Sequence, residues 1–183
     1  MTKTIILTLL IAGVFIAGSL ATNEAYAAAF MKLGDIKGES QVEGHEGAID
    51  IESWSWGETN TGTAGHGGGA GSGKVLPQDL NIIKATDRGS PLIMQAGAEG
   101  EVFRTAVLIM TRDSSEGQQD YLIITMENVM VSSYQINGSG DDGSIPTESV
   151  SLNFQKLEMK YIPESDDGSE EPVIGTVSKH GRK

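Results

Sequence analysis

Cysteine is absent from the sequence. Its absence excludes disulfides, cysteine-ligated zinc and cysteine nucleophiles, so the fold must be stabilised by burial, by sheet hydrogen bonds or by association between chains. Histidine is also scarce: His45, His66 and His180 lie in polar or glycine-rich segments, with no second histidine at ligand spacing. A zinc site needs three or four convergent ligands, so we interpret these histidines as solvated loop residues and predict neither a metal nor a cofactor.

Positive charge is the next feature in short supply. The 183 residues include 13 lysines and arginines against 25 aspartates and glutamates, which gives a formal net charge of -12 at pH 7. Binding to phosphate groups requires clustered lysine and arginine, so the composition argues against nucleic acid as a partner.

One long apolar stretch stands at the N-terminus. It runs from Ile5 to Leu20, is short for a membrane span and has no positively charged flank after it. Ala25-Tyr26-Ala27 then has small residues at the spacing that a signal peptidase accepts. We therefore predict a signal peptide over 1–27, cleaved between Ala27 and Ala28, with cleavage after Ala28 or Ala29 as nearby alternatives. The mature protein is expected to be secreted, without a stable membrane anchor. An uncleaved anchor and a buried helix are the alternatives.

After this leader, short β-branched and aromatic runs alternate with clusters of glycine, serine, asparagine and aspartate. Such spacing is typical of an antiparallel sandwich or barrel and predicts about seven to nine strands in a single domain over 28–163. The expected strands are Phe30–Leu33, Ala48–Trp56, Val75–Leu76, Leu80–Ala85, Val102–Thr111, Tyr121–Glu127, Val129–Asn137 and Val150–Tyr161.

One segment carries helix signals instead. Ser90 is suited to cap a short helix, Pro91 to occupy its first position and Gly97 to end it. We expect this helix to pack against the barrel, because a helix this short is not stable alone. The apolar residues expected on its packed side are Leu92, Ile93 and Ala96.

Two segments are expected to be flexible. Gly62–Gly73 is a glycine-rich connection, and the tail 164–183 is first acidic and then basic. We expect the connection to be mobile unless another molecule orders it. The tail is only briefly apolar, at Val173-Ile174, and we expect it to be partly disordered.

Motifs that would support catalysis are incomplete. Gly68–Val75 follows the phosphate-binding pattern up to its last position, where Val75 replaces the serine or threonine that holds magnesium, and Pro77 interrupts the helix that should follow. Paired acids such as Asp141-Asp142 lie in turn-like segments, where solvated turn residues are the simpler interpretation than a calcium site. We predict that the protein is not an enzyme.

Two further features have more than one interpretation. Trp54 and Trp56 fall on the same face of an expected strand, which favours the core or a contact between subunits over a sugar-stacking platform. Asn137-Gly138-Ser139 matches the acceptor sequence for N-glycosylation and is equally suited to a plain turn.

Several segments, taken in order, resemble the haemolysin-coregulated protein (Hcp) family, the tube protein of the type VI secretion system. The likeness extends from about Phe30 to Ile162. The segments that carry it are Met31-Lys32-Leu33, Ile36 to Ser40, Ser53 to Gly57, Ser90-Pro91-Leu92, Asn128 to Tyr134 and Pro146 to Phe154.

This resemblance implies a mainly β fold, a two-sheet β-barrel with one short helix on its side, that forms a hexameric ring. Rings of that family stack into a tube, with a spike protein at its tip and effectors in its lumen, and the subunit has no catalytic site. The loop from Gly57 to Lys74 is then expected to contact a neighbouring ring. The residues that we expect at contacts between copies are Trp54, Trp56, Gly57, Gly68, Gly69, Lys74, Ser133 and Tyr134.

The leader is the feature that departs from the family, because its tube subunits assemble in the cytoplasm and need no signal peptide. Our leading hypothesis is therefore an exported structural subunit that assembles into rings or tubes. The alternatives are a true type VI tube protein with an unusual N-terminus, and a secreted module that binds carbohydrate or a small ligand through Trp54 and Trp56.

Overall fold

The structure is a computed structural model that describes residues 28–60, 75–114, 117–140, 143–164 and 171–179. The predicted signal peptide lies outside these residues. Eleven strands and one helix occur within them. Their bounds are β1 Ala29–Leu33, β2 Ile49–Ile51, β3 Ser53–Ser55, β4 Glu58–Asn60, β5 Val75–Pro77, β6 Leu80–Ala85, α1 Ser90–Glu99, β7 Val102–Ser114, β8 Gly117–Asn137, β9 Thr147–Asn153, β10 Lys156–Tyr161 and β11 Val173–Ser178.

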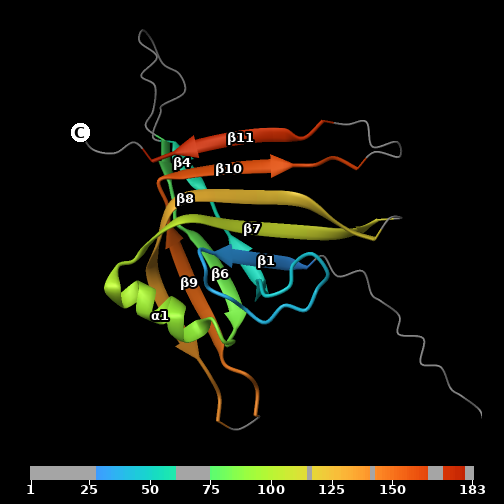
Figure 1. The fold of residues 1–183 in the computed structure, drawn as a ribbon. Coiled ribbons are helices and arrows are strands. Elements are labelled where there is room, and N and C mark those ends of the chain that lie inside the picture. The colour runs from blue at the N-terminus through green and yellow to red at the C-terminus, as the bar shows by residue number, and fades with distance from the viewer. Residues whose placement is uncertain (1–27, 61–74, 115–116, 141–142, 165–170, 180–183) are drawn as a thin grey trace, which may run out of the picture.

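The long strand β8 belongs to two sheets. Its first part pairs with β7 and β10, whereas residues 130–137 pair with β9. We call the order β2-β1-β7-β8-β10-β11 sheet I and the order β8-β9-β6-β3 sheet II. Sheet I runs across the view in Figure 1, and sheet II crosses it steeply. Asn128 lies where β8 passes between them and has a φ of 51°, a backbone conformation that asparagine tolerates better than most residues.

The predicted fold class is confirmed: the protein is mainly β, with one helix. Sheets I and II are two parts of one hydrogen-bonded nine-stranded sheet, and β4 and β5 form a separate two-stranded sheet. Among the described residues the hydrogen-bond ladder does not close into a complete barrel, because β2 and β3 lie at its two ends and do not pair with each other. The chain passes directly from β2 to β3 at Glu52, whose amide donates to the carbonyl of Ile83 at 2.9 Å. This link joins the two sheets on the side where pairing is absent.

Alternating side chains of both sheets form one core. Met31, Leu108 and Ile124 face it from sheet I, and Ile82 and Val150 face it from sheet II; all five are 0–1% exposed. Alternation of this kind follows from the two-residue period of a strand, which puts every second side chain on the same face. All five residues lie in segments that the sequence predicts to be strands.

The helix is longer than predicted. Gly97 lies within it, and α1 ends at Gly100, which has a left-handed φ of 68°. A Cβ at Gly97 would approach Cγ1 of Val131 to 3.2 Å, so this glycine permits close packing of the helix on β8 instead of ending it. Leu92 was expected on the packed side but is 50% exposed. No helix in the described part of the chain is long and apolar enough to cross a membrane.

Strand boundaries account for the other differences. Two predicted strands are each divided in the structure: Ala48–Trp56 forms β2 and β3, and Val150–Tyr161 forms β9 and β10. Conversely, the two predicted strands on either side of Asn128 form the single strand β8. The tail was expected to be flexible, but Val173–Ser178 forms β11 and pairs with β10 over its whole length.

Candidate assembly surfaces

Two of the residues expected at contacts between copies lie at opposite edges of sheet II. Trp54 pairs with Ile82, Ile82 with Val150 and Val150 with Tyr134, so one row of side chains crosses all four strands. Ile82 and Val150 are buried, whereas Trp54 and Tyr134 at the ends of the row are half-buried and pack against the core. Each edge of sheet II thus has an aromatic residue that is only partly covered by its own chain.

Trp56 and Gly57 lie where sheet II meets the small sheet of β4 and β5. The indole Nε1 of Trp56 donates to the carbonyl of Gln78 at 3.2 Å, and the amide of Gln78 donates to the carbonyl of Gly57 at 3.0 Å. Both tryptophans pack against the core instead of forming a free aromatic platform. This arrangement gives no support to the carbohydrate-binding alternative.

The remaining expected positions divide into two groups. Ala28, Ser133 and Asn137 are described: the carbonyl of Ala28 accepts the amide of Thr111 at 2.9 Å, Ser133 is exposed, and Asn137 is the exposed last residue of β8. Glycosylation of Asn137 stays a prediction. The positions that lie outside the described residues are Ala27, His66, Gly68, Gly69, Lys74 and His180.

The outward face of sheet II carries no charged side chain within its strands. Because Leu80, Ile82 and Lys84 face inward, the alternate positions face outward. Small polar residues dominate the two cross-strand rows there, which are Ser55-Asn81-Ser151-Ser133 and Ser53-Ile83-Ser149-Gln135. An uncharged face of this size is notable in a chain with a net charge of -12.

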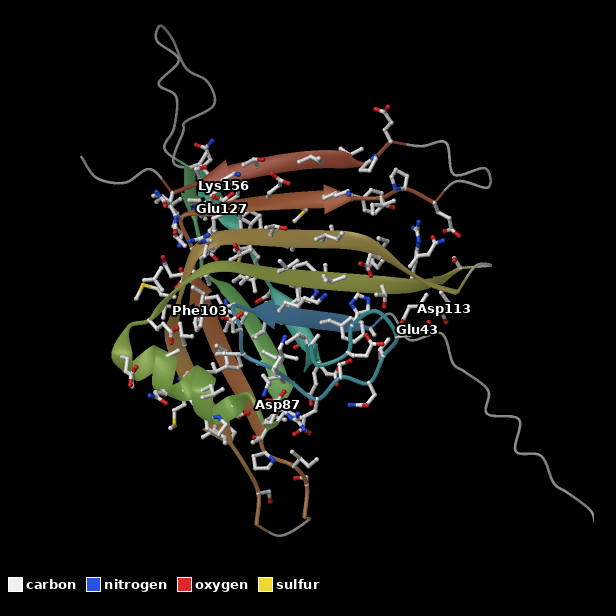
Figure 2. All side chains as sticks on the ribbon, viewed as in Figure 1. Glu43, Asp87, Phe103, Asp113, Glu127 and Lys156 are labelled. Carbon is white, nitrogen blue, oxygen red and sulfur yellow. The ribbon has the colours of Figure 1, made fainter. Side chains whose placement is uncertain are left out.

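A buried ionic cluster connects sheet II to the start of α1. The side chains of Lys84 and Glu148 are 0% exposed, and Lys84 Nζ lies 3.1 Å from Glu148 Oε2 and 2.9 Å from Asp87 Oδ1. The same ammonium donates to Ser90 Oγ at 2.9 Å and to the carbonyl of Ala85 at 2.7 Å. Asp87 lies at the beginning of the helix (Figure 2). Ser90 thus binds Lys84 and the amide of Asp87, and Gly89 is the N-cap residue that Ser90 was predicted to be.

Tyr134 is electrostatically coupled to this cluster. Burial, followed by the nearby carboxylates of Glu148 and Asp87, raises the pKa of Tyr134 to about 12. The phenol is therefore neutral at physiological pH and can lie beside the buried acids without adding charge. Sequence reasoning missed the cluster, although Lys84 and Glu148 alternate with apolar residues at core positions of their strands.

The interpretation of His45 as a solvated residue is wrong. Its side chain lies flat on Phe30, with ring centroids 4.4 Å apart and planes 7° apart, and the residue is 7% exposed. Its Nε2 lies 3.0 Å from Asp120 Oδ1. Among the residues that the structure describes, no group of three potential ligands could hold a metal. His45 therefore serves to cover Phe30.

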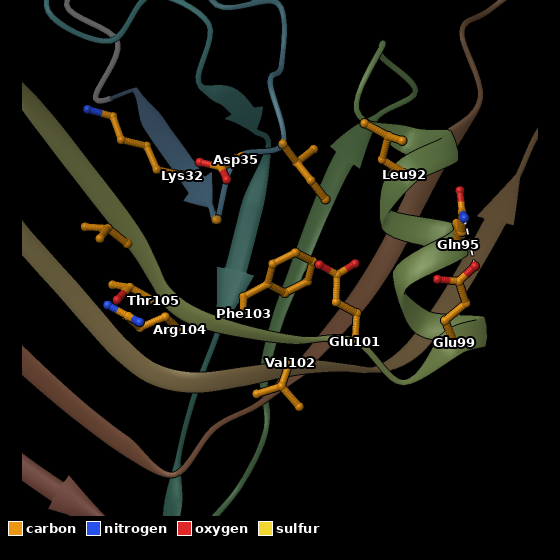
Figure 3. A pocket seen from close by; sticks show the side chains of 13 residues that line it. Lys32, Asp35, Leu92, Gln95, Glu99, Glu101, Val102, Phe103, Arg104 and Thr105 are labelled. Carbon is orange, nitrogen blue, oxygen red and sulfur yellow. Dashed lines mark hydrogen bonds between the residues drawn. The ribbon is translucent and has the colours of Figure 1, made fainter.

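An open pocket of about 850 Å³ lies between α1, β1 and the start of β7. Phe103 points into it, and Leu92 and Val102 lie along its edge (Figure 3). Glu99 on its rim accepts a hydrogen bond from Gln95 at 2.7 Å. Of the residues that we expected at contacts between copies, none of those that the structure describes lines this pocket.

The last strand is anchored by an ion pair. Lys179 Nζ lies 2.9 Å from Asp79 Oδ1, and Asp79 also accepts hydrogen bonds from Asn153 at 2.7 Å and from Ser132 at 2.6 Å. Burial raises the pKa of Asp79, but the three hydrogen bonds and the charge of Lys179 outweigh it and hold the pKa below its ordinary value of 3.8. The ion pair fastens the end of β11 beside sheet II.

This shift predicts an acid-sensitive contribution to stability. Because the folded pKa of Asp79 is depressed, its contribution is fully present above pH 3.8 and is lost as the pH falls through the folded pKa. We expect Asp79→Asn to lower the free energy of unfolding at neutral pH and to flatten its fall below pH 3.8. Urea titrations across this pH range measure both effects. If the free energy of unfolding of Asp79→Asn falls below pH 3.8 as steeply as that of the wild type, Asp79 is not the source of the acid sensitivity.

Comparison with known proteins gives consistent matches. Residues 30–161 match the family model described as "Type VI secretion system effector, Hcp". The chain is 47% identical over 142 residues to Protein hcp1 of Pseudomonas aeruginosa, which covers 78% of this chain and 87% of that protein. Its fold is similar to a structure described as a type six secretion system protein, with a TM-score of 0.74 and 25% identity over 82% of this chain and 93% of the other.

A second solved structure shares the fold. The crystal structure of Hcp1 from Salmonella typhimurium has a TM-score of 0.66 and 23% identity, and the match covers 84% of this chain and 95% of the other. At this level of identity the likeness concerns the fold alone.

Proposed function

Because the chain belongs to the Hcp family of type VI secretion proteins, we propose that it is a structural subunit that assembles into hexameric rings, which stack into a tube. The observation that carries this proposal is the extent of the family match, which spans residues 30–161 and includes every described strand from β2 to β10. The relative at 47% identity supports it. The subunit is structural and not catalytic, and it acts without a cofactor.

In this assembly the outward face of sheet II lines the channel. Its small, uncharged side chains support this orientation, because polar groups of this size stay hydrated and attract neither sign of charge. The outward face of sheet I differs, since Lys32, Glu158 and Lys160 project from it. Effectors in the lumen and a spike protein at the tip of the tube are the proposed partners.

Export by a cleaved leader is the second element of the proposal. Residues 1–27 carry the pattern of a signal peptide, so the assembled protein should consist of chains that begin at Ala28. A tube assembled from chains that keep residues 1–27 would instead favour the ordinary cytoplasmic route of the family.

We expect the full chain, expressed in a bacterial host that recognises the leader, to form rings of uniform size. Light scattering after size-exclusion chromatography measures the mass of the assembly, electron microscopy its shape, and intact mass spectrometry the N-terminus of its subunits. A monomer at every concentration would overturn the assembly proposal, and assembled chains that begin at Met1 would overturn only the cleavage.

A further inference from the structure

Asn137 lies where the ladder between β8 and β9 ends. It is the last residue of β8 and pairs with Thr147 in the final pair of that ladder. Gly138 follows outside the strand, and both Asn137 and Gly138 are exposed. The connection that begins here projects from the end of sheet II (Figure 1). The peptide bond between these two residues is therefore open to water.

Pro146 explains why the ladder stops at this point. A Cβ at Gly138 would lie 3.2 Å from Cγ of Pro146, so the two residues are neighbours across the hairpin. Proline has no amide hydrogen to donate. Its carbonyl oxygen already accepts the amide of Thr86 at 2.8 Å and the hydroxyl of Thr86 at 2.9 Å. Pro146 thus offers no partner to Gly138, and within the described part of the chain no hydrogen bond holds the amide of Gly138.

The side chain of Asn137 is also free to move. Two other asparagines near it in the sequence are held: Asn128 Nδ2 donates to Gln155 Oε1 at 2.6 Å, and Asn153 Nδ2 donates to Asp79 Oδ1 at 2.7 Å. Among the residues that the structure describes, no hydrogen bond holds the carboxamide of Asn137. Its Cγ can therefore approach the neighbouring amide nitrogen without breaking a contact.

We propose that Asn137 is a site of spontaneous deamidation. The amide nitrogen of Gly138 attacks Cγ of Asn137 and closes a succinimide ring, while the bond from Cγ to Nδ2 breaks and ammonia leaves with the amide proton. Water then opens the ring by adding a hydroxyl group to one carbonyl carbon and hydrogen to the ring nitrogen, which yields aspartate or isoaspartate. Glycine in the following position favours this attack, because it has no Cβ to obstruct the nitrogen.

The reaction changes the outward face of sheet II. Ile136 pairs with the buried Glu148, so the next residue, Asn137, faces outward in a row with Thr147 and Ala85. Deamidation gives this uncharged face a carboxylate, and isoaspartate also adds a methylene group to the main chain at the last pair of the ladder. The chemistry does not depend on the proposed function. Where sheet II lines the channel, each converted copy adds one negative charge to it.

Timed incubation of the folded protein at mildly alkaline pH, followed by trypsin and fragment mass spectrometry, tests the proposal. Trypsin releases Asn128, Asn137 and Asn153 in one peptide, because no lysine or arginine lies between Arg112 and Lys156. We expect Asn137 to convert more than about tenfold faster than the other two, which precede valine and phenylalanine instead of glycine. Isoaspartate, measured by enzymatic methylation, should be among the products, since it forms only through the ring. A sample digested before incubation corrects for conversion during digestion.

Gly138→Ala is the matched variant, because it keeps the Asn137 side chain and obstructs the nitrogen. It should slow the conversion by about tenfold. Since the added Cβ lies 3.2 Å from Cγ of Pro146, its fold is checked by urea titration, and the comparison within the wild type decides the question if this variant does not fold.

Three results would overturn the proposal: equal rates at the three asparagines, aspartate without isoaspartate, or a glycan on Asn137, because glycosylation and deamidation use the same side-chain nitrogen. None of these results bears on assembly, which light scattering measures separately.

Discussion

Replacing Lys84 with methionine should lower the free energy of unfolding by about 3–5 kcal/mol, the usual effect of removing one partner of a buried ion pair. Lys84 and Glu148 are both 0% exposed and their charged atoms lie 3.1 Å apart. Methionine fills most of the volume but leaves the Glu148 carboxylate without its cation. Urea unfolding followed by tryptophan fluorescence measures the loss, at one fixed protein concentration because assembly also stabilises the folded state.

A double replacement separates charge from packing. Lys84→Met combined with Glu148→Leu removes the fully buried pair, so part of the lost stability should return, as it does when apolar residues replace a buried pair. The recovery should be incomplete, because Asp87, which lies 2.9 Å from Lys84 Nζ, still loses its cation. The control is Lys156→Met, which breaks the exposed pair with Glu127 at 2.7 Å (Figure 2) and should change little because solvent screens such pairs. Losses that simply add in the double variant would show that Lys84 and Glu148 do not depend on each other.

The single replacement Lys84→Met should also make the start of α1 less stable. Lys84 is the residue that connects sheet II to Asp87 and Ser90 at the start of the helix. Without Lys84, the first turn of α1 loses the hydrogen bonds that connect Asp87 and Ser90 to sheet II. Gly89 cannot compensate, because it provides no side-chain cap. Faster hydrogen exchange at the start of α1 is therefore expected in Lys84→Met and not in Lys156→Met.

The sequence alone predicts most strand segments, because runs of β-branched and aromatic residues between clusters of turn residues are a local signal. Ile82 and Val150 lie in segments assigned to strands by this signal, and both are core residues. The ends of the elements depend on contacts that are distant in the sequence. Gly97 has the residue type of a helix end, but its role is to let α1 approach Val131, more than thirty residues away in the chain.

The arrangement of the candidate surfaces depends on strand order, which the sequence does not state. Trp54 and Tyr134 are 80 residues apart, and they share a row only because β3, β6, β9 and β8 are neighbours in that order. Lys84 could have been found, since it continues the inward alternation of Leu80 and Ile82. Its partner Glu148 could not have been paired with it without the register of β6 and β9.

Gly38 illustrates a different constraint, one imposed by backbone that approaches too closely for any side chain. A Cβ at Gly38 would lie 2.3 Å from the carbonyl oxygen of Ala48 and 2.5 Å from Cα of Ile49. Neither atom can rotate away, because both belong to the backbone around the start of β2. The amide of Gly38 also donates to the carbonyl of Gly47 at 2.9 Å, which closes the loop from 34 to 48.

We therefore expect Gly38→Ala to lower the free energy of unfolding by about 3 kcal/mol, the upper part of the usual range for overpacking. The loop must shift to admit the methyl group, and the shift moves His45 off Phe30. The matched control is Gly175→Ala, because a Cβ there meets nothing within 4 Å and the backbone is not left-handed. If Gly38→Ala unfolds at the same urea concentration as Gly175→Ala, then the loop from 34 to 48 can shift to admit the methyl group at little cost in free energy. In that case the loop does not hold His45 on Phe30.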